Sequence, residues 1–343
     1  MKKISRRNFL NESIFLAGSV FFFSEIETSS ERMGRNGQEK KKEYPSYLGL
    51  EKAGLLSQRA DQLYSFYENC HLCPRDCRVN RLKGEIGRCQ SSSRVKVSSA
   101  FPHFGEEAPL VGKMGSGTVF FSNCGLRCVY CQNYTISIQG EGTEISDQQL
   151  AEIMIKLQNL GCHNINLVTP THYLPNIVSA LRHACRLGLH IPLVYNTGGY
   201  EVIEALELLD GIIDIYMPDC KYMDSASAGK YSEEAYNYPH YAKKALKEMF
   251  RQVGDLELDE KGIAVRGLII RHLILPNRIA GSEKFLKFVA EELSKTTYLN
   301  LMRQYRPEHK ALQYPAIARR LNTREYEEVL AWAKKYGLSR LDK

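Results

Sequence analysis

Residues 118–131 read Thr-Val-Phe-Phe-Ser-Asn-Cys-Gly-Leu-Arg-Cys-Val-Tyr-Cys. The stretch begins as an apolar run typical of a buried strand and continues as a loop with Cys124, Cys128 and Cys131 at the spacing C-x3-C-x2-C. Three thiolates can hold three corners of a cubane iron–sulfur cluster, whereas complete ligation normally takes four. The fourth iron would stay open to a ligand, as the open position of a catalytic zinc does. The stretch therefore indicates a reaction centre at a strand end.

Three other interpretations of these cysteines stay open at this point: a structural zinc site, a ferredoxin-type carrier, and unrelated cysteines on a loop. The preceding strand favours the reaction centre, because structural context is what confirms a motif. With Tyr130 before the third cysteine, the stretch resembles the radical S-adenosylmethionine (SAM) superfamily, whose motif is C-x3-C-x-aromatic-C. The resemblance implies a [4Fe-4S] cluster on Cys124, Cys128 and Cys131, with Tyr130 near SAM. SAM would chelate the open iron through its amino and carboxylate groups, and an electron from a flavodoxin- or ferredoxin-type reductant would release a 5′-deoxyadenosyl radical.

Downstream of residue 115, short apolar runs alternate with amphipathic stretches. The expected strands are 118–121, 164–168, 193–195, 212–216, 265–272 and 298–302. The expected helices are 147–159, 174–187, 202–209, 239–253, 282–294 and 323–336. This alternation predicts βα units around a parallel sheet, and six units are two short of an eight-fold barrel. The resemblance implies the matching α/β fold, an open, partial (β/α)6 TIM-like barrel.

Polar residues gather where these expected strands end, which is where barrels of this kind carry their chemistry. The ends resemble those of glycyl-radical-enzyme activating enzymes, in which a D-x-K motif contacts SAM. Asp219 and Lys221 match that motif, although a surface ion pair is the other interpretation of such a pair. In the activating enzymes a Thr and a Met also hold a monovalent cation beside the SAM carboxylate. Thr197 and Met217 match them, with Asn196 where those enzymes carry Asp.

The resemblance covers about residues 65–320 and is closest to uncharacterised relatives of the pyruvate formate-lyase activating enzymes. Those enzymes usually carry a G-G-E motif after the second strand, which binds the SAM amino group. Here Thr169 and Thr171 stand at that place, so they are the candidates for that contact. The substrate does not follow from the resemblance. If the resemblance to the activating enzymes extends to the substrate, the substrate is a backbone glycine of a glycyl-radical protein. The alternatives are a small molecule, a peptide or a nucleic-acid base.

A second group of cysteines, at the spacing C-x2-C-x3-C-x11-C, precedes the expected barrel. Its members are Cys70, Cys73, Cys77 and Cys89. Four thiols with glycines that turn the chain back can close around one metal centre. A second iron–sulfur cluster and a structural zinc both suit thiolate ligands, and disulfides or free thiols remain the third interpretation. Residues 46–115 are therefore expected to form a Cys-rich, metal-binding N-terminal module before a core at 116–343.

The N-terminus has the pattern of a targeting signal. Arg6 and Arg7 lie in Ser-Arg-Arg-Asn-Phe-Leu, before a modest apolar run, so residues 1–25 resemble a twin-arginine signal. Residues 26–45 are polar and charged, as a linker would be. The expectation is folding and cluster loading in the cytoplasm, followed by export or membrane tethering. The alternatives are a cytoplasmic protein and a non-catalytic exported electron-transfer protein.

Composition excludes little. The net charge of +7 over 343 residues is too small to argue for nucleic-acid binding by itself. The apolar run near the N-terminus is about half of the ~20 residues that a spanning helix needs, so no transmembrane span is expected.

Overall fold

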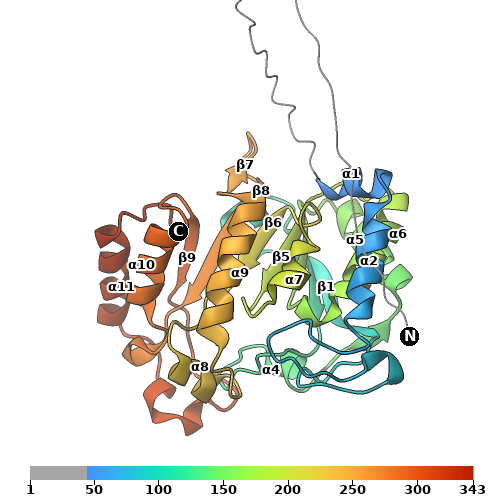
Figure 1. Ribbon diagram of the computed structural model, residues 1–343. Coiled ribbons are helices and arrows are strands. Elements are labelled where there is room, and N and C mark those ends of the chain that lie inside the picture. Colours follow the sequence, from blue (N-terminus) through green and yellow to red (C-terminus); the bar gives the residue numbers. More distant parts are fainter. Residues whose placement is uncertain (1–44, 343) are drawn as a thin grey trace, which may run out of the picture. The chain divides into compact units, whose positions relative to one another are not determined.

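A nine-stranded, mostly parallel sheet organises residues 45–342, the part of the chain that the computed structural model describes (Figure 1). The strands are β1 Val95–His103, β2 Ser116–Phe121, β3 Thr143–Ile145, β4 Ile165–Val168, β5 Leu193–Thr197, β6 Ile215–Pro218, β7 Glu257–Leu258, β8 Ala264–Leu273 and β9 Tyr298–Met302. The signal-like segment at 1–25 and residues 26–44 of the expected linker lie outside the described residues, so both stay predictions.

Six strands, β2, β4, β5, β6, β8 and β9, pair in parallel in that order. They correspond to the six strands expected from the sequence, and the α/β fold with a parallel central sheet is confirmed. Among the described residues β2 and β9 are not paired with each other, so the sheet is open. Every residue of β5 and of β6 is buried, which is the pattern of parallel strands covered on both faces.

The strands β1 and β3 add an antiparallel edge beside β2, and β7 pairs antiparallel with β8. The sequence did not predict these three strands. In particular, β1 lies within the segment 46–115 and yet pairs with the first strand of the parallel set. The Cys-rich segment therefore shares a sheet with the core, and all described residues belong to one compact unit.

Eleven α-helices lie in the described residues. They are α1 Tyr47–Lys52, α2 Leu55–Ser65, α3 Ala108–Val111, α4 Tyr134–Ser137, α5 Asp147–Asn159, α6 Leu174–Arg186, α7 Ile203–Glu207, α8 Ser225–Tyr231, α9 Tyr238–Val253, α10 Ser282–Glu292 and α11 Thr323–Lys335. Two of them begin with a capping box, Ser146 with Gln149 and Asn322 with Glu325, in which both side chains satisfy free amide groups of the first turn. None of the helices in residues 45–342 is long and apolar enough to cross a membrane.

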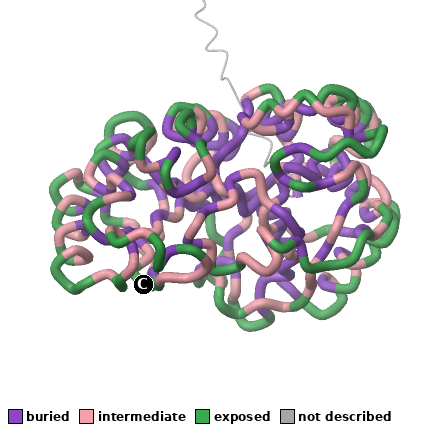
Figure 2. The backbone as a smooth tube through the Cα atoms, turned by 90° about the horizontal axis from the view of Figure 1, so that it is seen from below, coloured by how far each residue is buried: buried purple, intermediate pink, exposed green. Residues whose placement is uncertain are grey.

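The core lies between the sheet and the helices that follow its strands. Figure 2 shows buried residues in the interior of the fold and exposed residues mostly at its periphery. Helix α2 packs on α6, which in turn packs against α5. This packing extends the helical layer of the core to the N-terminal segment and holds the Cys-rich loop that follows α2 near the carboxyl ends of the strands.

Candidate functional site

A pocket with a cavity volume of about 230 Å³ lies between the cysteine loop after β2 and the carboxyl ends of β4, β5, β6 and β8. Parallel strands all end at one edge of their sheet, so residues far apart in the sequence meet there. The structure brings together nine of the residues that the sequence singled out: Cys124, Cys128, Tyr130, Cys131, Thr169, Asn196, Thr197, Asp219 and Lys221.

Two other candidates lie apart from this cavity. Thr171 lines a smaller, adjoining pocket together with Cys124 and Thr197. The side chain of Met217 is fully buried in an apolar cluster with Val194 and Ile269. Met217 therefore has only its backbone to offer to a cation at the strand end.

The cysteine loop presents its three sulfurs with hydrogen-bond partners already in place. The Ser232 hydroxyl donates to Cys128 Sγ at 2.9 Å, and the backbone amide of Leu126 donates to Cys124 Sγ at 3.4 Å. Cys131 Sγ lies 3.0 Å from the Ser137 hydroxyl. Hydrogen bonds to ligand sulfurs are one of the means by which proteins tune iron–sulfur clusters. The donor set thus fits the group that the motif implies.

Burial raises the pKa of the Cys128 thiol to about 11, although the Lys221 ammonium acts in the opposite direction. A metal would reverse this effect, because a coordinating thiol is deprotonated outright. Within the described residues, no three His, Cys, Asp or Glu side chains converge on one point as the ligands of a single metal ion do. In a cubane cluster each thiolate binds a different iron, so its ligands need not converge in that way.

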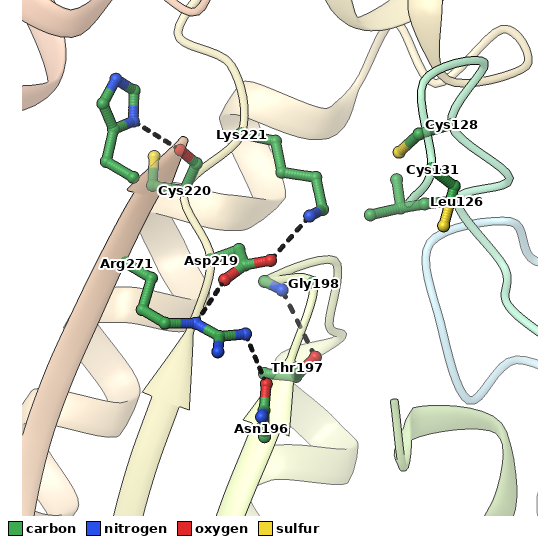
Figure 3. A network of polar contacts seen from close by, with 12 residues as sticks. Leu126, Cys128, Cys131, Asn196, Thr197, Gly198, Asp219, Cys220, Lys221 and Arg271 are labelled. Carbon is green, nitrogen blue, oxygen red and sulfur yellow. Dashed lines mark hydrogen bonds and ion pairs between the residues drawn. The ribbon is translucent and has the colours of Figure 1, made fainter. Parts of the chain in front are cut away.

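Opposite the cysteine loop, a charged network joins the ends of three strands (Figure 3). Lys221 Nζ lies 2.6 Å from Asp219 Oδ2, and Arg271 Nε donates to Asp219 Oδ1 at 2.8 Å. Arg271 Nη2 also donates to Asn196 Oδ1 at 2.6 Å. In Figure 3 the Lys221 side chain extends towards Cys128 and Cys131.

The Asp219 and Lys221 side chains are only 14% and 19% exposed, so the pair does not lie on the open surface. Burial alone would raise the pKa of Asp219, but the charges of Arg271 and Lys221 prevail and hold it below its usual value. The carboxylate therefore stays ionised and holds two cations at the pocket wall.

Arg271 is a pocket residue that the sequence reasoning missed. Glu106 and Glu107, from the loop after β1, lie 3.5 and 3.9 Å from its guanidinium. With Asp219 they surround one arginine with three carboxylates. A charged residue near the end of the apolar run at 265–272 was the signal that could have identified it, because such runs are buried in a parallel sheet.

The end of β4 carries backbone strain. Thr169 has φ +60°, a left-handed conformation that is rare for a β-branched residue. Its backbone amide donates to Asn196 O at 2.8 Å, which ties the ends of β4 and β5 together. Strain of this kind clusters at functional sites, and Thr169 lines both pockets.

The second cysteine group lies in the loop that follows α2. Cys70 and Cys89 are each 7% exposed, and none of the ten cysteines forms a disulfide. Burial raises the pKa of Cys73, and the thiols of Cys89, Cys70 and Cys77 raise it further. Like charges act in this way only when they are near one another, so Cys73 has the other three thiols in its neighbourhood, although among the described residues no three of them converge on one point as the ligands of a single metal ion do.

A buried cation stands beside this group. The Arg81 side chain is fully buried, donates to the carbonyl of His172 at 2.7 Å and lies 4.1 Å from the centre of the Tyr67 ring. Residues 45–342 offer it no carboxylate as a salt-bridge partner. Its pKa is raised, against the effect of burial, by Tyr67 and by the thiols of Cys89 and Cys70. A sequence search for metal ligands does not find such a residue.

The two cysteine groups are neighbours. A Cβ atom at Gly125 would lie 3.6 Å from Cys73 Sγ, and Cys73 and Cys124 line the same small pocket. Arg75 joins the segments, because it donates to Gly125 O at 2.8 Å and to Ser232 O at 2.9 Å. The side chain of Arg75 therefore holds both the cysteine loop and the segment that carries the Ser232 hydroxyl.

Comparison with known proteins agrees with this geometry. The family model described as "Radical SAM superfamily" matches residues 118–252, a range that runs from β2 into α9. The chain is also similar to "Uncharacterized protein MJ0674" of Methanocaldococcus jannaschii, with 34% identity over 297 residues that cover 84% of this chain and 80% of that protein. The second match extends well beyond the range of the family model.

Proposed function

This chain belongs to the radical SAM superfamily, and we propose that it binds and reductively cleaves SAM in the pocket between the cysteine loop and the strand ends. Membership makes the chain an enzyme of the radical SAM type, with a [4Fe-4S] cluster and SAM as its cofactors. One observation carries the assignment to this pocket. Three thiols from one loop and charged groups from the ends of β6 and β8 line the same cavity.

Cys124, Cys128 and Cys131 would hold the cluster. The cluster would supply the electron for reductive cleavage of SAM to methionine and a 5′-deoxyadenosyl radical able to abstract a hydrogen atom. Lys221 and Arg271 offer two cations to the SAM carboxylate, and Asp219 keeps both in place. Tyr130, packed against Tyr222 and Tyr305, forms a buried wall of the same pocket. Leu126, Leu273 and Met302 add apolar lining, which helps to exclude water from a reactive intermediate.

The decisive experiment is anaerobic reconstitution with iron and sulfide, reduction in the presence of SAM, and chromatography for 5′-deoxyadenosine. Wild-type protein should form it, and Cys128→Ala should not. Cys185→Ala is the matched control, since Cys185 lies in α6 outside both cysteine groups. If wild-type protein neither binds SAM nor forms 5′-deoxyadenosine, the result would favour a non-catalytic electron-transfer protein.

We also propose a second metal–thiolate centre at Cys70, Cys73, Cys77 and Cys89. An iron–sulfur cluster is favoured over zinc, because among the described residues no three of these thiols converge as the ligands of a single metal ion do. Arg81 supports it, because a fully buried guanidinium without a carboxylate partner is costly. Thiolates bound to a metal would provide the missing negative charge. Protein that carries Cys128→Ala should retain metal at this site, and Cys73→Ala should release it. Loss of all bound metal in Cys128→Ala alone would contradict an independent second centre.

For the substrate we propose a backbone glycine of a partner protein, on the basis of the D-x-K resemblance at Asp219 and Lys221. A flavodoxin- or ferredoxin-type protein is the proposed reductant. The test incubates the enzyme with SAM, reductant and a candidate glycyl-radical protein, and records the electron paramagnetic resonance spectrum. A glycyl radical signal supports the proposal. Formation of 5′-deoxyadenosine without that signal favours a small molecule, a peptide or a nucleic-acid base.

A further inference from the structure

A buried carboxylate lies directly behind the pocket wall. Glu201, four residues after the end of β5, is fully buried. The Thr171 hydroxyl donates to its Oε1 at 2.6 Å, and the Thr197 hydroxyl donates to the same oxygen. The Tyr195 hydroxyl donates to Oε2 at 3.2 Å. Within residues 45–342 no Lys, Arg or His forms an ion pair with this carboxylate, so three hydroxyl groups are its partners.

These contacts determine what the two threonines can offer to a ligand. A threonine hydroxyl has one hydrogen and two lone pairs, and both Thr171 and Thr197 direct the hydrogen to Glu201. Their oxygens, 3.4 Å apart, are left as acceptors. Thr197 Oγ1 already accepts a hydrogen bond from the backbone amide of Gly199 at 3.3 Å, which agrees with a hydroxyl whose own hydrogen points to Glu201. Hydrogen bonds to an anion polarise such hydroxyls and make their oxygens stronger acceptors.

The charge state of Glu201 agrees with this role. Burial raises the pKa of its carboxyl to about 6, and hydrogen bonds from Thr171, Thr197 and Tyr195 act in the opposite direction. Three hydroxyl groups that all direct their hydrogens to this side chain are the partners that an ionised carboxylate requires.

Both threonines line pockets beside the cysteine loop. Thr197 and Cys124 line the large cavity, and Thr171 lines the adjoining pocket with the same two residues. A Cβ atom at Gly198 would lie 2.8 Å from Leu126 Cδ1, so the end of β5 approaches the cysteine loop closely. The acceptors thus lie near Cys124, whereas Lys221 and Arg271 supply cations elsewhere on the wall.

We propose that Glu201 is a positioning residue that orients Thr171 and Thr197 as paired acceptors for the amino group of SAM. This inference rests on the proposed function. A primary amine bound to a metal keeps two N–H donors, which matches two acceptor oxygens. The cations suit the carboxylate of the same amino acid group. The chain has Thr169 and Thr171 in place of the G-G-E motif and so lacks the acidic residue of that motif. Glu201, in the loop after β5, would take over its role by acting through the two threonines.

The test measures binding rather than turnover. Reconstituted full-length protein is titrated anaerobically with S-adenosylhomocysteine, which retains the amino group, and with its desamino analogue. Glu201→Gln can keep its amide oxygen at the Oε1 position and turn its NH₂ towards the Tyr195 hydroxyl, so both threonines still donate to it and both affinities should stay near wild type. Glu201→Leu offers no acceptor, so the hydrogens of Thr171 and Thr197 are free to turn towards the pocket. We expect Glu201→Leu to bind S-adenosylhomocysteine about tenfold more weakly, which is the effect of about one hydrogen bond. Affinity for the desamino analogue should stay unchanged.

Two further variants separate positioning from folding. Tyr195→Phe removes the third hydroxyl from Glu201 without touching the pocket and should leave both affinities near wild type. Thr171→Val removes one acceptor while Glu201 stays in place, and should reproduce the selective loss even if Glu201→Leu does not fold. An equal loss for both ligands, or no loss, in Glu201→Leu and Thr171→Val would overturn the inference. A wild type that binds neither ligand would instead contradict the proposed function.

Discussion

Replacing Lys221 by Met removes one charge from the pocket while keeping the length of the side chain. The ammonium nitrogen lies 2.6 Å from Asp219 Oδ2. Burial would lower the pKa of Lys221, but the Asp219 carboxylate and the thiols of Cys128 and Cys131 raise it above its usual value. It is therefore a fixed positive charge between the carboxylate and the cysteine loop.

The expected loss can be worked from these contacts. A charge-assisted hydrogen bond to a carboxylate contributes about 1.5–3 kcal/mol, which corresponds to roughly ten- to hundredfold weaker SAM binding. Stability should change little, because Asp219 keeps its 2.8 Å contact with Arg271 and is not left as an unpaired buried charge.

The assay titrates SAM into reduced, reconstituted protein and follows the cluster spectrum. Lys247→Met is the matched control, since Lys247 pairs with Glu292 at 2.5 Å on the exposed surface, where its side chain is 50% exposed. The control should bind SAM as the wild type does. If Lys221→Met also binds SAM with wild-type affinity and an intact cluster, Lys221 does not contact SAM, and the D-x-K assignment of this strand end is wrong.

Three further predictions concern the cysteines, the charged network and acid stability. Cys128→Ala should lose the SAM-responsive cluster but keep the N-terminal metal. Cys73→Ala should release that metal and lower stability, because the free energy of metal binding there contributes to folding. Metal analysis and thermal unfolding check both variants. Arg271→Met should destabilise by about 3–5 kcal/mol in urea unfolding, because Glu106 and Glu107 lose their shared cation while Asp219 keeps Lys221; a much smaller loss would mean that the two glutamates are hydrated. His272 is buried, and burial lowers its pKa to about 4. Its contribution to stability is therefore complete above its unfolded pKa of about 6.5. As the pH falls from there to about 4, the free energy of unfolding should decrease by about 1.4 kcal/mol per pH unit. His272→Asn should flatten this slope in urea unfolding between pH 7.5 and 4.5, and an unchanged slope would contradict a neutral, buried imidazole.

The parallel sheet was predictable because its strands are short apolar runs bounded by turns and separated by helical patterns. Helix α5 begins and ends where the sequence placed it, at 147 and 159, since Ser146 is a strong N-cap. The strand β1 was missed because most of its residues are only partly buried, so no clear periodicity marks it.

What the sequence by itself determined is the chemistry that resides in local spacing. Cys124, Cys128 and Cys131 lie within one loop, and Asp219 and Lys221 within one strand end, so their spacing in the chain is also their spacing in space. The α/β class followed for the same reason, because each strand and each helix is a local pattern.

Only the tertiary structure decided which residues complete the site. Arg271 reaches Asp219 across 52 positions of sequence, and Arg75 reaches Ser232 across 157. Glu201 is unremarkable in the sequence, yet it becomes the acceptor for hydroxyls from two other segments. These roles depend on which strands are neighbours and on which charges are left without a partner after burial, and both follow from long-range packing that no local pattern encodes.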